Sequence, residues 1–412
     1  MAAVFSIGTE LTRGELINSN AAWLGDRLVE LGFDVVEHCT VDDDEGRIAS
    51  ALERLCAANE VVVCTGGLGP TSDDLTAATV ARTMGVSLRR DDSIVDSIRE
   101  KFRAFGREMP EANAKQGDFP EGASILPNPI GTAPGFSVRI GRALAFFMPG
   151  VPREMEKMFA ERVAPLIESL APRTTYQTHI KTFGMTESGV AEAIADLEDK
   201  AGGIVIGYRA SFPEIEVKIL AQASTRLEAE KRSAAVAEKV RARLGDAVFG
   251  GRDDHFENKV VDGLREQGIR IAVAESCTGG MIGELITSIP GSSDVLLLSA
   301  VTYSNEAKKN LLGVTDAILD EHGAVSEACA RAMAEGVLRL TNADRAVAVT
   351  GIAGPGGGSA DKPVGTVWFS VAYKNAPTVS KLRRFPGDRE RVRRFAAYFA
   401  LELLSQVPQN VT

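Results

Sequence analysis

Several features that would place a protein in a special class are missing from these 412 residues. No apolar run approaches the roughly 20 residues that a membrane-spanning helix requires. The first residues, MAAVFSIGTE, lack the basic start of a secretory signal peptide. The five cysteines are odd in number and form no C-x-x-C pair, which fits a reducing compartment. We therefore expect a cytoplasmic protein that does not enter a membrane.

An excess of positive charge is also missing. Lysine and arginine total 46 against 56 aspartate and glutamate residues, which gives a net charge of -10. Such a chain has no general attraction for nucleic acid or anionic lipid, so a phosphate-bearing ligand would need a local site. The one basic stretch, KLRRFPGDRERVRRF, is interpreted as the polar face of an amphipathic helix that continues into AAYFALELL.

Residues 1–170 alternate between strand and helix patterns, which predicts βαβ units on a mainly parallel sheet. The predicted strands are AVFSIG, FDVVEHCTV, EVVVCTGG, SILPNP, GFSVRI and ALAFFMPG. The predicted helices are NSNAAWLGDRLVELG, GRIASALERLCAAN, LTAATVARTMG and VPREMEKMFAERVAPLIESL. We expect these residues to form one domain.

Residues 173–250 have a different pattern. Two period-two segments, THIKTFG and PEIEVKILAQAS, accompany the helical segments ESGVAEAIADLEDK and TRLEAEKRSAAVAEKVRARLG. This arrangement is similar to a KH module, but no G-x-x-G clamp lies between the helices, and the charge does not suit RNA. We therefore favour a spacer or dimer-forming connector over a nucleic-acid binder.

A second α/β series occupies residues 255–412. Its predicted strands are IRIAVAES, DVLLLSAVTY, RAVAVTG and VGTVWFSVAY, and its predicted helices are FENKVVDGLREQG, GGMIGELITSI, SNEAKKNLLG and SEACARAMAEGVLRLTN. The fold class is therefore α/β. We predict two three-layer αβα domains with mainly parallel sheets, joined by the small α+β KH-like connector.

Three strands of the second series end in polar residues, namely Ser276, Tyr303 and Thr350. Ligands gather at the carboxyl ends of strands in such sheets. Gly279 and Gly280 follow Ser276, and their N–H groups could face an oxyanion at the start of a helix.

A serine nucleophile needs a base, and the four histidines form no recognisable Ser-His-Asp pattern. Lys308 could serve if burial lowers its pKa, and the Tyr303 phenol could relay the proton.

The residues alone leave alternatives open for each of these positions. Cys277 is intrinsically more reactive than Ser276, although adjacent residues leaving a strand point to opposite sides, so only one of them can face the cleft. Ser276 and Thr278 could also be no more than helix caps. Lys308 taken alone is typical of a solvated helix lysine, and Tyr303 of an aromatic residue at a strand end.

The stretch TGIAGPGGGSADKPVGT, residues 350–366, could wrap a phosphate or ribose with backbone N–H groups, or be a flexible hairpin. It matches neither a Walker A motif nor a G-x-G-x-x-G followed by a helix. Arg389, in PGDRE, could add a cation for a phosphate group.

Four segments in this order, AESCTGG, VTYSNEAK, AVTGIAGPGGG with KPVGTVW, and FPGDRE, resemble the nicotinamide-mononucleotide deamidase domain of the competence/damage-inducible CinA family. The resemblance covers residues 257 to 408. It implies that Ser276 is the nucleophile, that Tyr303 and Lys308 activate it, and that no cofactor or metal is needed for this step. The implied substrate-binding residues are Thr278, Gly279, Gly280, Thr350, Gly351, Gly354, Gly356 and Arg389.

The N-terminal half offers its own candidate motif in CTGGLGPTSDDLT, residues 64–76. Glycines let the backbone approach a phosphate, and the carboxylates Asp73 and Asp74 could hold a divalent cation or simply cap a helix. Glu10 ends the first strand, and Asn18 lies near the next helix. The loops NPIGTAPG and MPGVPREM add further turns.

Together these motifs resemble the molybdopterin-binding-like domain that forms the N-terminal half of full-length CinA proteins. The likeness implies a pyrophosphatase that cleaves ADP-ribose with a divalent metal ion, held here by Asp73, Asp74 and Glu10. The implied substrate-binding residues are Gly66, Gly67, Gly69, Asn18, Thr132, Pro149 and Gly150. The segment TRGELINSN after Glu10 departs from the more leucine-rich form expected there.

The sequence therefore predicts a bifunctional enzyme of pyridine-nucleotide salvage, forming a homodimer and acting on nicotinamide mononucleotide and ADP-ribose. Two alternatives stay open. The N-terminal domain could bind a pterin or nucleotide without turnover, or the protein could be a competence factor that associates with nucleic acid. The acidic composition and the missing G-x-x-G make the last alternative the least favoured.

Overall fold

The computed structural model describes residues 1–406, so the end of the predicted 255–412 domain lies outside the described residues. The chain divides into two compact units. Unit 1 comprises Met1–Gln177, Asp199–Val205 and Leu220–Ala235, and unit 2 comprises Thr178–Glu198, Ile206–Ile219 and Val236–Thr412. In the described part of the chain, no helix is both long enough and apolar enough to cross a bilayer.

Unit 1 is built on a six-stranded sheet in the order β2-β1-β3-β8-β7-β6. Its strands are β1 (Ala2–Ile7), β2 (Val35–Val41), β3 (Val61–Thr65), β6 (Ser124–Leu126), β7 (Gly135–Ile140) and β8 (Ala143–Met148). The pairs β2–β1, β1–β3 and β3–β8 are parallel, whereas β8–β7 and β7–β6 are antiparallel. Every residue of β1 and β3 is buried, because helices cover both faces of the sheet.

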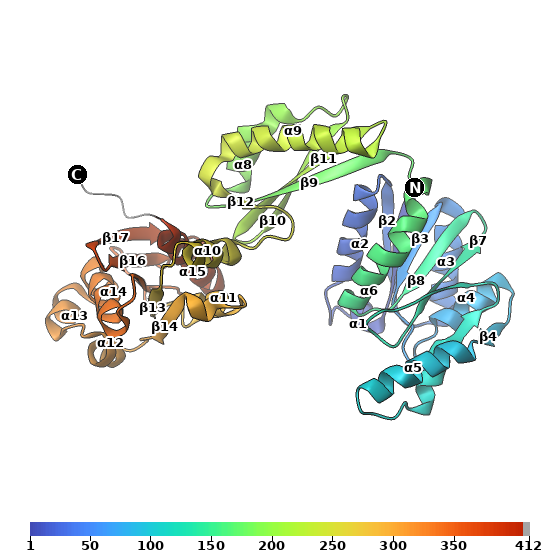
Figure 1. The fold of residues 1–412 in the computed structure, drawn as a ribbon, viewed down its shortest axis with the longest axis horizontal. Coiled ribbons are helices and arrows are strands. Elements are labelled where there is room, and N and C mark those ends of the chain that lie inside the picture. Colours follow the sequence, from blue (N-terminus) through green and yellow to red (C-terminus); the bar gives the residue numbers. More distant parts are fainter. Residues whose placement is uncertain (407–412) are drawn as a thin grey trace. The chain divides into compact units, whose positions relative to one another are not determined.

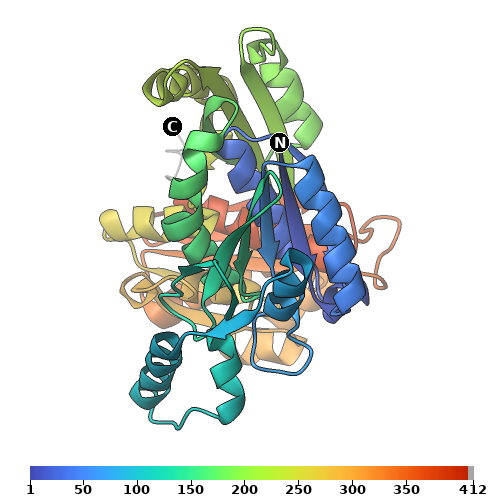
Figure 2. The ribbon, with the colours of Figure 1, turned by 90° about the vertical axis from the view of Figure 1, so that its right-hand side faces the viewer.

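Helices pack on both faces of this sheet and make it three-layered (Figure 1). On one face lie α2 (Ser19–Glu30), α6 (Pro152–Met158) and α7 (Ala164–Ile167), with an apolar core around Leu24 and Phe159. On the other lie α3 (Glu45–Ala58) and α4 (Thr76–Met84), packed around Leu52 and Val80. Figure 2 shows α6 and α3 on opposite sides of the sheet.

Unit 1 also contains smaller elements that the sequence patterns did not predict. They are α1 (Thr9–Thr12), α5 (Asp92–Ala104) and an antiparallel pair formed by β4 (Leu88–Arg90) and β5 (Asp118–Pro120). Asp91 caps the start of α5, because its carboxylate accepts hydrogen bonds from two backbone N–H groups of the first turn.

The predicted KH-like region contains a four-stranded sheet in the order β10-β11-β9-β12. Its strands are β9 (Thr174–Phe183), β10 (Ile204–Ser211), β11 (Glu214–Ala223) and β12 (Val248–Gly250), and its helices are α8 (Glu187–Ile194) and α9 (Arg226–Leu244). The sequence analysis missed β10, since its exposed and buried residues follow no clear period of two. Strands β9, β10 and β11 each contribute residues to both compact units.

Unit 2 also contains a five-stranded sheet in the order β14-β13-β15-β16-β17. Its strands are β13 (Ile271–Glu275), β14 (Leu296–Val301), β15 (Arg345–Gly351), β16 (Thr366–Tyr373) and β17 (Ala376–Arg384). Strands β14, β13 and β15 are parallel, and β16 and β17 continue the sheet antiparallel.

Helices again cover both faces of the five-stranded sheet. One core contains α10 (Phe256–Glu266), α11 (Met281–Thr287) and α15 (Arg389–Ser405), and the other contains α12 (Asn305–Leu312), α13 (Asp316–His322) and α14 (Glu327–Thr341). The predicted fold class, two αβα domains with a KH-like α+β region, is confirmed. In the six-stranded and five-stranded sheets, the parallel strands form one side and the antiparallel strands form the other.

Two local predictions need correction. Strand β14 ends at Val301, so Tyr303 lies in the loop beyond the strand. The basic stretch KLRRFPGDRERVRRF is not one helix, because its first four residues belong to β17 and α15 begins only at Arg389. Pro386 and Gly387 separate the two elements, and the Asp388 carboxylate caps the helix.

Gly336 brings α14 against the end of α12, the helix that carries Lys308. A Cβ atom at Gly336 would lie 2.1 Å from the Leu312 carbonyl oxygen, a backbone atom that cannot move independently. We expect Gly336→Ala to lower the free energy of unfolding by about 1–3 kcal/mol, despite the roughly 1 kcal/mol by which alanine is favoured in helices.

Gly263→Ala on α10 is the matched control, since no atom lies within 4 Å of its Cβ position. It should raise stability by about 0.5–1 kcal/mol. Thermal unfolding of both variants measures the difference, and a Gly336→Ala protein as stable as the wild type would contradict the packing argument.

Candidate functional site

Ser276 and Lys308 meet at the carboxyl end of the parallel strands of unit 2. Ser276 follows β13, and Lys308 projects from the first turn of α12. The Lys308 Nζ atom lies 3.0 Å from Ser276 Oγ, 2.9 Å from the Thr302 carbonyl oxygen and 3.2 Å from the Tyr303 carbonyl oxygen. The lysine is only 1% exposed. The predicted nucleophile and base are therefore in direct contact.

Burial lowers the pKa of Lys308 below its ordinary value, because an ammonium group loses hydration in this position. Within the described residues, no carboxylate lies at ion-pair distance from Nζ. As an ammonium group, Nζ donates to all three oxygen atoms. As a neutral amine, it would keep two N–H groups for the carbonyl oxygens and could accept from the Ser276 hydroxyl with its lone pair.

Tyr303 does not have the geometry expected for a proton relay. Its phenol oxygen accepts a hydrogen bond of 3.0 Å from Arg389, and its side chain is 58% exposed. The contact between Tyr303 and Lys308 is made by the backbone carbonyl. The predicted proton relay through the phenol is therefore corrected. The phenol is hydrogen-bonded to Arg389, a partner that sequence spacing could not reveal.

Arg389 connects Tyr303 to the glycine-rich loop. Besides the phenol, its guanidinium donates to the Gly354 carbonyl oxygen at 2.9 Å. Thr350 lies at the end of β15, but its hydroxyl donates to the Ala324 carbonyl oxygen at 2.7 Å. Gly351 packs against Thr366 and Val367, whereas a Cβ atom at Gly356 would meet only open space. The loop therefore has a fixed base and an open tip.

The turn after Ser276 is held by Glu275, a residue that the sequence analysis did not single out. Its carboxylate is fully buried and accepts hydrogen bonds from the N–H groups of Gly280, Ile282 and Gly283. A fourth comes from the Ser299 hydroxyl. An acidic residue just before a predicted helix start is the signal that could have identified it.

This arrangement corrects the predicted role of the two glycines. The Gly279 N–H donates to the Ser276 carbonyl oxygen, and the Gly280 N–H donates to Glu275, so neither is available to an oxyanion. Among the described residues, the N–H groups of Cys277 and Thr278 donate to no other residue. Those two groups are the candidates for the oxyanion site.

Two further residues complete the turn. Arg393, also missed by the sequence analysis, donates to the Thr278 carbonyl oxygen from Nε at 3.3 Å and from a terminal nitrogen at 2.8 Å. Thr278 itself is fully buried, and its hydroxyl has no partner among the described residues. Cys277 is buried as well, and burial raises its pKa to about 12, which leaves almost no thiolate at neutral pH.

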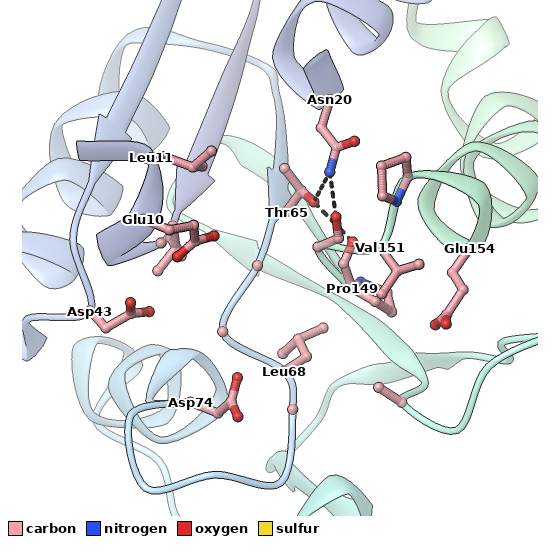
Figure 3. Close-up of a pocket in the computed structure, with 18 of the residues that line it drawn as sticks. Glu10, Leu11, Asn20, Asp43, Thr65, Leu68, Asp74, Pro149, Val151 and Glu154 are labelled. Carbon is pink, nitrogen blue, oxygen red and sulfur yellow. Dashed lines mark hydrogen bonds between the residues drawn. The ribbon is translucent and has the colours of Figure 1, made fainter. Parts of the chain in front are cut away.

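The predicted residues of the N-terminal half line a single cavity of about 560 Å³ (Figure 3). It lies at the carboxyl ends of β1 and β3, where the first α/β sheet leaves room for a ligand. The predicted residues that line it are Glu10, Asn18, Gly66, Gly67, Gly69, Asp73, Asp74, Thr132, Pro149 and Gly150. The lining residues that sequence reasoning missed include Asp43, Thr65, Gln116 and Glu154, and Asn20 also lines the cavity.

Asn20 ties two walls of this cavity together, as the dashed lines in Figure 3 show. Its amide donates to Thr65 Oγ at 3.2 Å and to the Gly150 carbonyl oxygen at 2.8 Å. The Thr65 hydroxyl donates in turn to the Pro149 carbonyl oxygen at 2.9 Å. Asn18, by contrast, caps α2 and donates to the Thr40 hydroxyl, so its side chain stabilises the local structure.

The carboxylates of the cavity do not form a ready cation site. Asp43 accepts hydrogen bonds of 2.8 Å from the N–H and hydroxyl of Thr9, and Asp74 accepts from the N–H of Thr71 at 2.8 Å. In the part of the chain that the structure describes, no three histidine, cysteine, aspartate or glutamate side chains are grouped closely enough to hold a metal ion. The predicted set of Glu10, Asp73 and Asp74 thus shares a cavity without forming a metal cage.

Three family models match successive parts of the chain. A model described as "Probable molybdopterin binding domain" matches residues 3–169, "Damage-inducible protein CinA KH domain" matches 177–250, and "CinA C-terminal domain" matches 253–407. A "CinA-like protein" of Geobacter sulfurreducens is 44% identical over 404 residues, 98% of each chain. The chain belongs to the CinA-like family.

A second CinA-like relative gives the same assignment. A "CinA-like protein" of Geobacter metallireducens is 43% identical over 408 residues, 98% of each chain. A solved structure of competence/damage inducible protein CihA from Agrobacterium tumefaciens is 41% identical and covers 37% of this chain and 94% of its own, with a TM-score of 0.36. Within this CinA-like protein, the cavity lies in the molybdopterin-binding match and Ser276 in the CinA C-terminal match.

Proposed function

We propose that the Ser276–Lys308 site hydrolyses the carboxamide of nicotinamide mononucleotide to nicotinate mononucleotide and ammonia. The observation that carries this proposal is the buried amine 3.0 Å from a serine hydroxyl. A buried lysine next to serine replaces the histidine of other serine hydrolases, because the low pKa lets it accept the serine proton. The substrate itself is supported by the resemblance to the CinA family.

The first half of the reaction forms an ester. Ser276 Oγ attacks the carboxamide carbon while its proton passes to Lys308, and the carbonyl oxygen becomes an oxyanion. The N–H groups of Cys277 and Thr278 would donate to that oxyanion. Collapse of the intermediate breaks the C–N bond, and Lys308 returns the proton to the leaving nitrogen, which departs as ammonia.

The second half repeats these steps with water. Lys308 accepts a proton from water as the water oxygen attacks the ester carbon. The C–O bond to Ser276 then breaks, and Lys308 returns the proton to Ser276 Oγ. The product forms as a carboxylic acid, which gives its remaining proton to solvent and leaves as the carboxylate. Arg389, which donates to the glycine-rich loop and to Tyr303, would pair with the phosphate of the substrate.

We also propose that the N-terminal cavity binds ADP-ribose and hydrolyses it to AMP and ribose 5-phosphate. Support comes from the glycine-rich edge at residues 66–69 and from a volume suited to a nucleotide. A divalent metal ion is part of this proposal by family resemblance. Because the carboxylates present do not group into a metal site, no catalytic step is assigned to the ion here.

Removal of either member of the Ser–Lys pair should abolish amide hydrolysis. We expect Ser276→Ala and Lys308→Ala each to reduce ammonia release from nicotinamide mononucleotide by about a thousandfold or more. Cys277→Ala should retain activity within about threefold of the wild type, since a buried thiol of high pKa is not the nucleophile. Ammonia release by Ser276→Ala at the wild-type rate would contradict the assignment of Ser276 as the nucleophile.

The pH dependence should report the amine of Lys308. The base must be neutral, and its pKa lies below the ordinary 10.5, so kcat/KM should be lost as the pH falls through that lowered pKa. Ammonia release between about pH 5 and about pH 10 measures the profile. Lys308→Arg is the control and should be inactive throughout, because arginine stays protonated. A profile that stays flat over this range would show that another group supplies the base.

Activity of the N-terminal cavity is tested by AMP formation from ADP-ribose, with Mg²⁺ or Mn²⁺ and with excess chelator. We expect formation of AMP, and a loss of about a hundredfold in Glu10→Gln because its carboxylate lines the cavity. The chelator shows whether a metal ion takes part. Glu10→Gln should leave ammonia release from nicotinamide mononucleotide unchanged, which separates the two activities. If no metal supports AMP formation, the cavity is a binding site without turnover.

A further inference from the structure

Helix α15 presents two opposite faces near its start. With about 100° of rotation per residue, Arg391, Phe395 and Tyr398 fall on one stripe, whereas Arg389 and Arg393 fall on the other. The two stripes are roughly half a turn apart. One stripe contacts the Ser276 site, and the other contacts the hairpin of β10 and β11.

The stripe of Arg389 and Arg393 faces the Ser276 site. Arg389 donates to the Tyr303 phenol and to the Gly354 carbonyl oxygen, and Arg393 donates twice to the Thr278 carbonyl oxygen. These two arginines therefore hold the glycine-rich loop and the turn after the nucleophile to a single helix.

The opposite stripe faces the hairpin formed by β10 and β11. The ring of Phe212, at the hairpin tip, meets the ring of Phe395 edge-on with centroids 4.5 Å apart. The Arg391 guanidinium carbon lies 4.8 Å from the centroid of the same Phe212 ring. A little further along, the Glu214 carboxyl is hydrogen-bonded to the Tyr398 side chain.

These hairpin residues and α15 belong to the same compact unit, which includes Ile206–Ile219 and Val236–Thr412. Phe212 is half-buried, and two of its contacts, Arg391 and Phe395, lie within the first two turns of the helix. Contacts near one end of a helix fix the position of that end most strongly, and this is the end that carries Arg389 and Arg393.

We propose that Phe212 is a positioning residue for the amide-hydrolysing site, seating the first turns of α15 so that Arg389 and Arg393 reach the glycine-rich loop and the Thr278 carbonyl. The inference rests on the proposed function of Ser276 and Lys308. It gives the KH-like region a role in the chemistry of the C-terminal domain, through a residue that touches neither nucleophile nor base.

The proposal predicts which kinetic constants change. Arg393 holds the turn whose N–H groups face the oxyanion, so a displaced α15 should lower kcat. Arg389 is placed for the substrate phosphate, so the same displacement should raise KM. We expect Phe212→Ala in the full-length protein to lower kcat/KM for ammonia release by about tenfold. Phe212→Tyr, which keeps the ring, should stay within about twofold of the wild type.

Phe105→Ala is the matched control, because Phe105 is an exposed aromatic residue at the end of α5 with 73% of its surface accessible. It should leave ammonia release unchanged. Thermal unfolding of each variant tests whether it is folded. If Phe212→Ala does not fold, Arg391→Ala carries the test, since it removes the other partner of the same ring contact.

A double-mutant cycle separates positioning from general loosening. If Phe212 acts through Arg393, then Phe212→Ala should reduce kcat by less than about twofold in an Arg393→Ala background. Losses that simply multiply would overturn the proposal, as would a Phe212→Ala enzyme with wild-type kcat and KM.

A second readout keeps this result independent of the substrate. A fluorophosphonate probe is attacked by Ser276 Oγ, forming an O–P bond and releasing fluoride, and its labelling rate measures the nucleophile and oxyanion site. If the wild type is labelled but releases no ammonia from nicotinamide mononucleotide, the substrate proposal fails. The double-mutant cycle of Phe212 and Arg393 is then measured with labelling rates. Slower labelling of Phe212→Ala than of the wild type supports the positioning role, and an unchanged labelling rate overturns it.

Discussion

Everything in the C-terminal site depends on the burial of one amine against one hydroxyl. Lys308 is nearly inaccessible, and its Nζ atom has only the Ser276 hydroxyl and two backbone carbonyl oxygens as partners. Burial without a counter-ion disfavours the ammonium form, which in the proposed reaction would let this lysine act as a base. Helix α12 carries this side chain, and α14 holds α12 in place because Gly336 allows close approach to Leu312. Core packing would therefore set the acid–base chemistry of that reaction.

The central elements could be predicted from the sequence because their patterns are unambiguous. Strands β1, β3 and β13 are short, wholly buried and mostly apolar. Helices α2 and α3 each bury one apolar face. The rule that ligands gather at strand ends then brought Ser276 and Lys308 into one site. Strand β10 was missed because exposed and buried positions follow no single period in it, and β17 was missed because its basic end was taken for part of the following helix.

The details of both sites depend on contacts between distant residues, which spacing in one sequence does not encode. The Tyr303 phenol was expected to relay a proton. In the structure, its oxygen instead accepts a hydrogen bond from Arg389, which lies far along the chain. The Gly279 and Gly280 N–H groups were expected to be open, but the Ser276 carbonyl and Glu275 accept them. In the N-terminal cavity, Asp74 was predicted as a metal ligand, and local hydrogen bonding to Thr71 occupies it in the structure.

The buried carboxylate of Glu275 has a consequence for the charge balance around Ser276. Its oxygen atoms accept four hydrogen bonds, three from backbone N–H groups of the turn after Ser276 and one from the Ser299 hydroxyl. The cationic side chains next to this turn are Arg389 and Arg393, which donate to the Gly354 and Thr278 carbonyl oxygens. In the proposed reaction, the positive charge that meets the substrate phosphate would therefore come from the last helix of the domain rather than from the elements that carry Ser276 and Lys308.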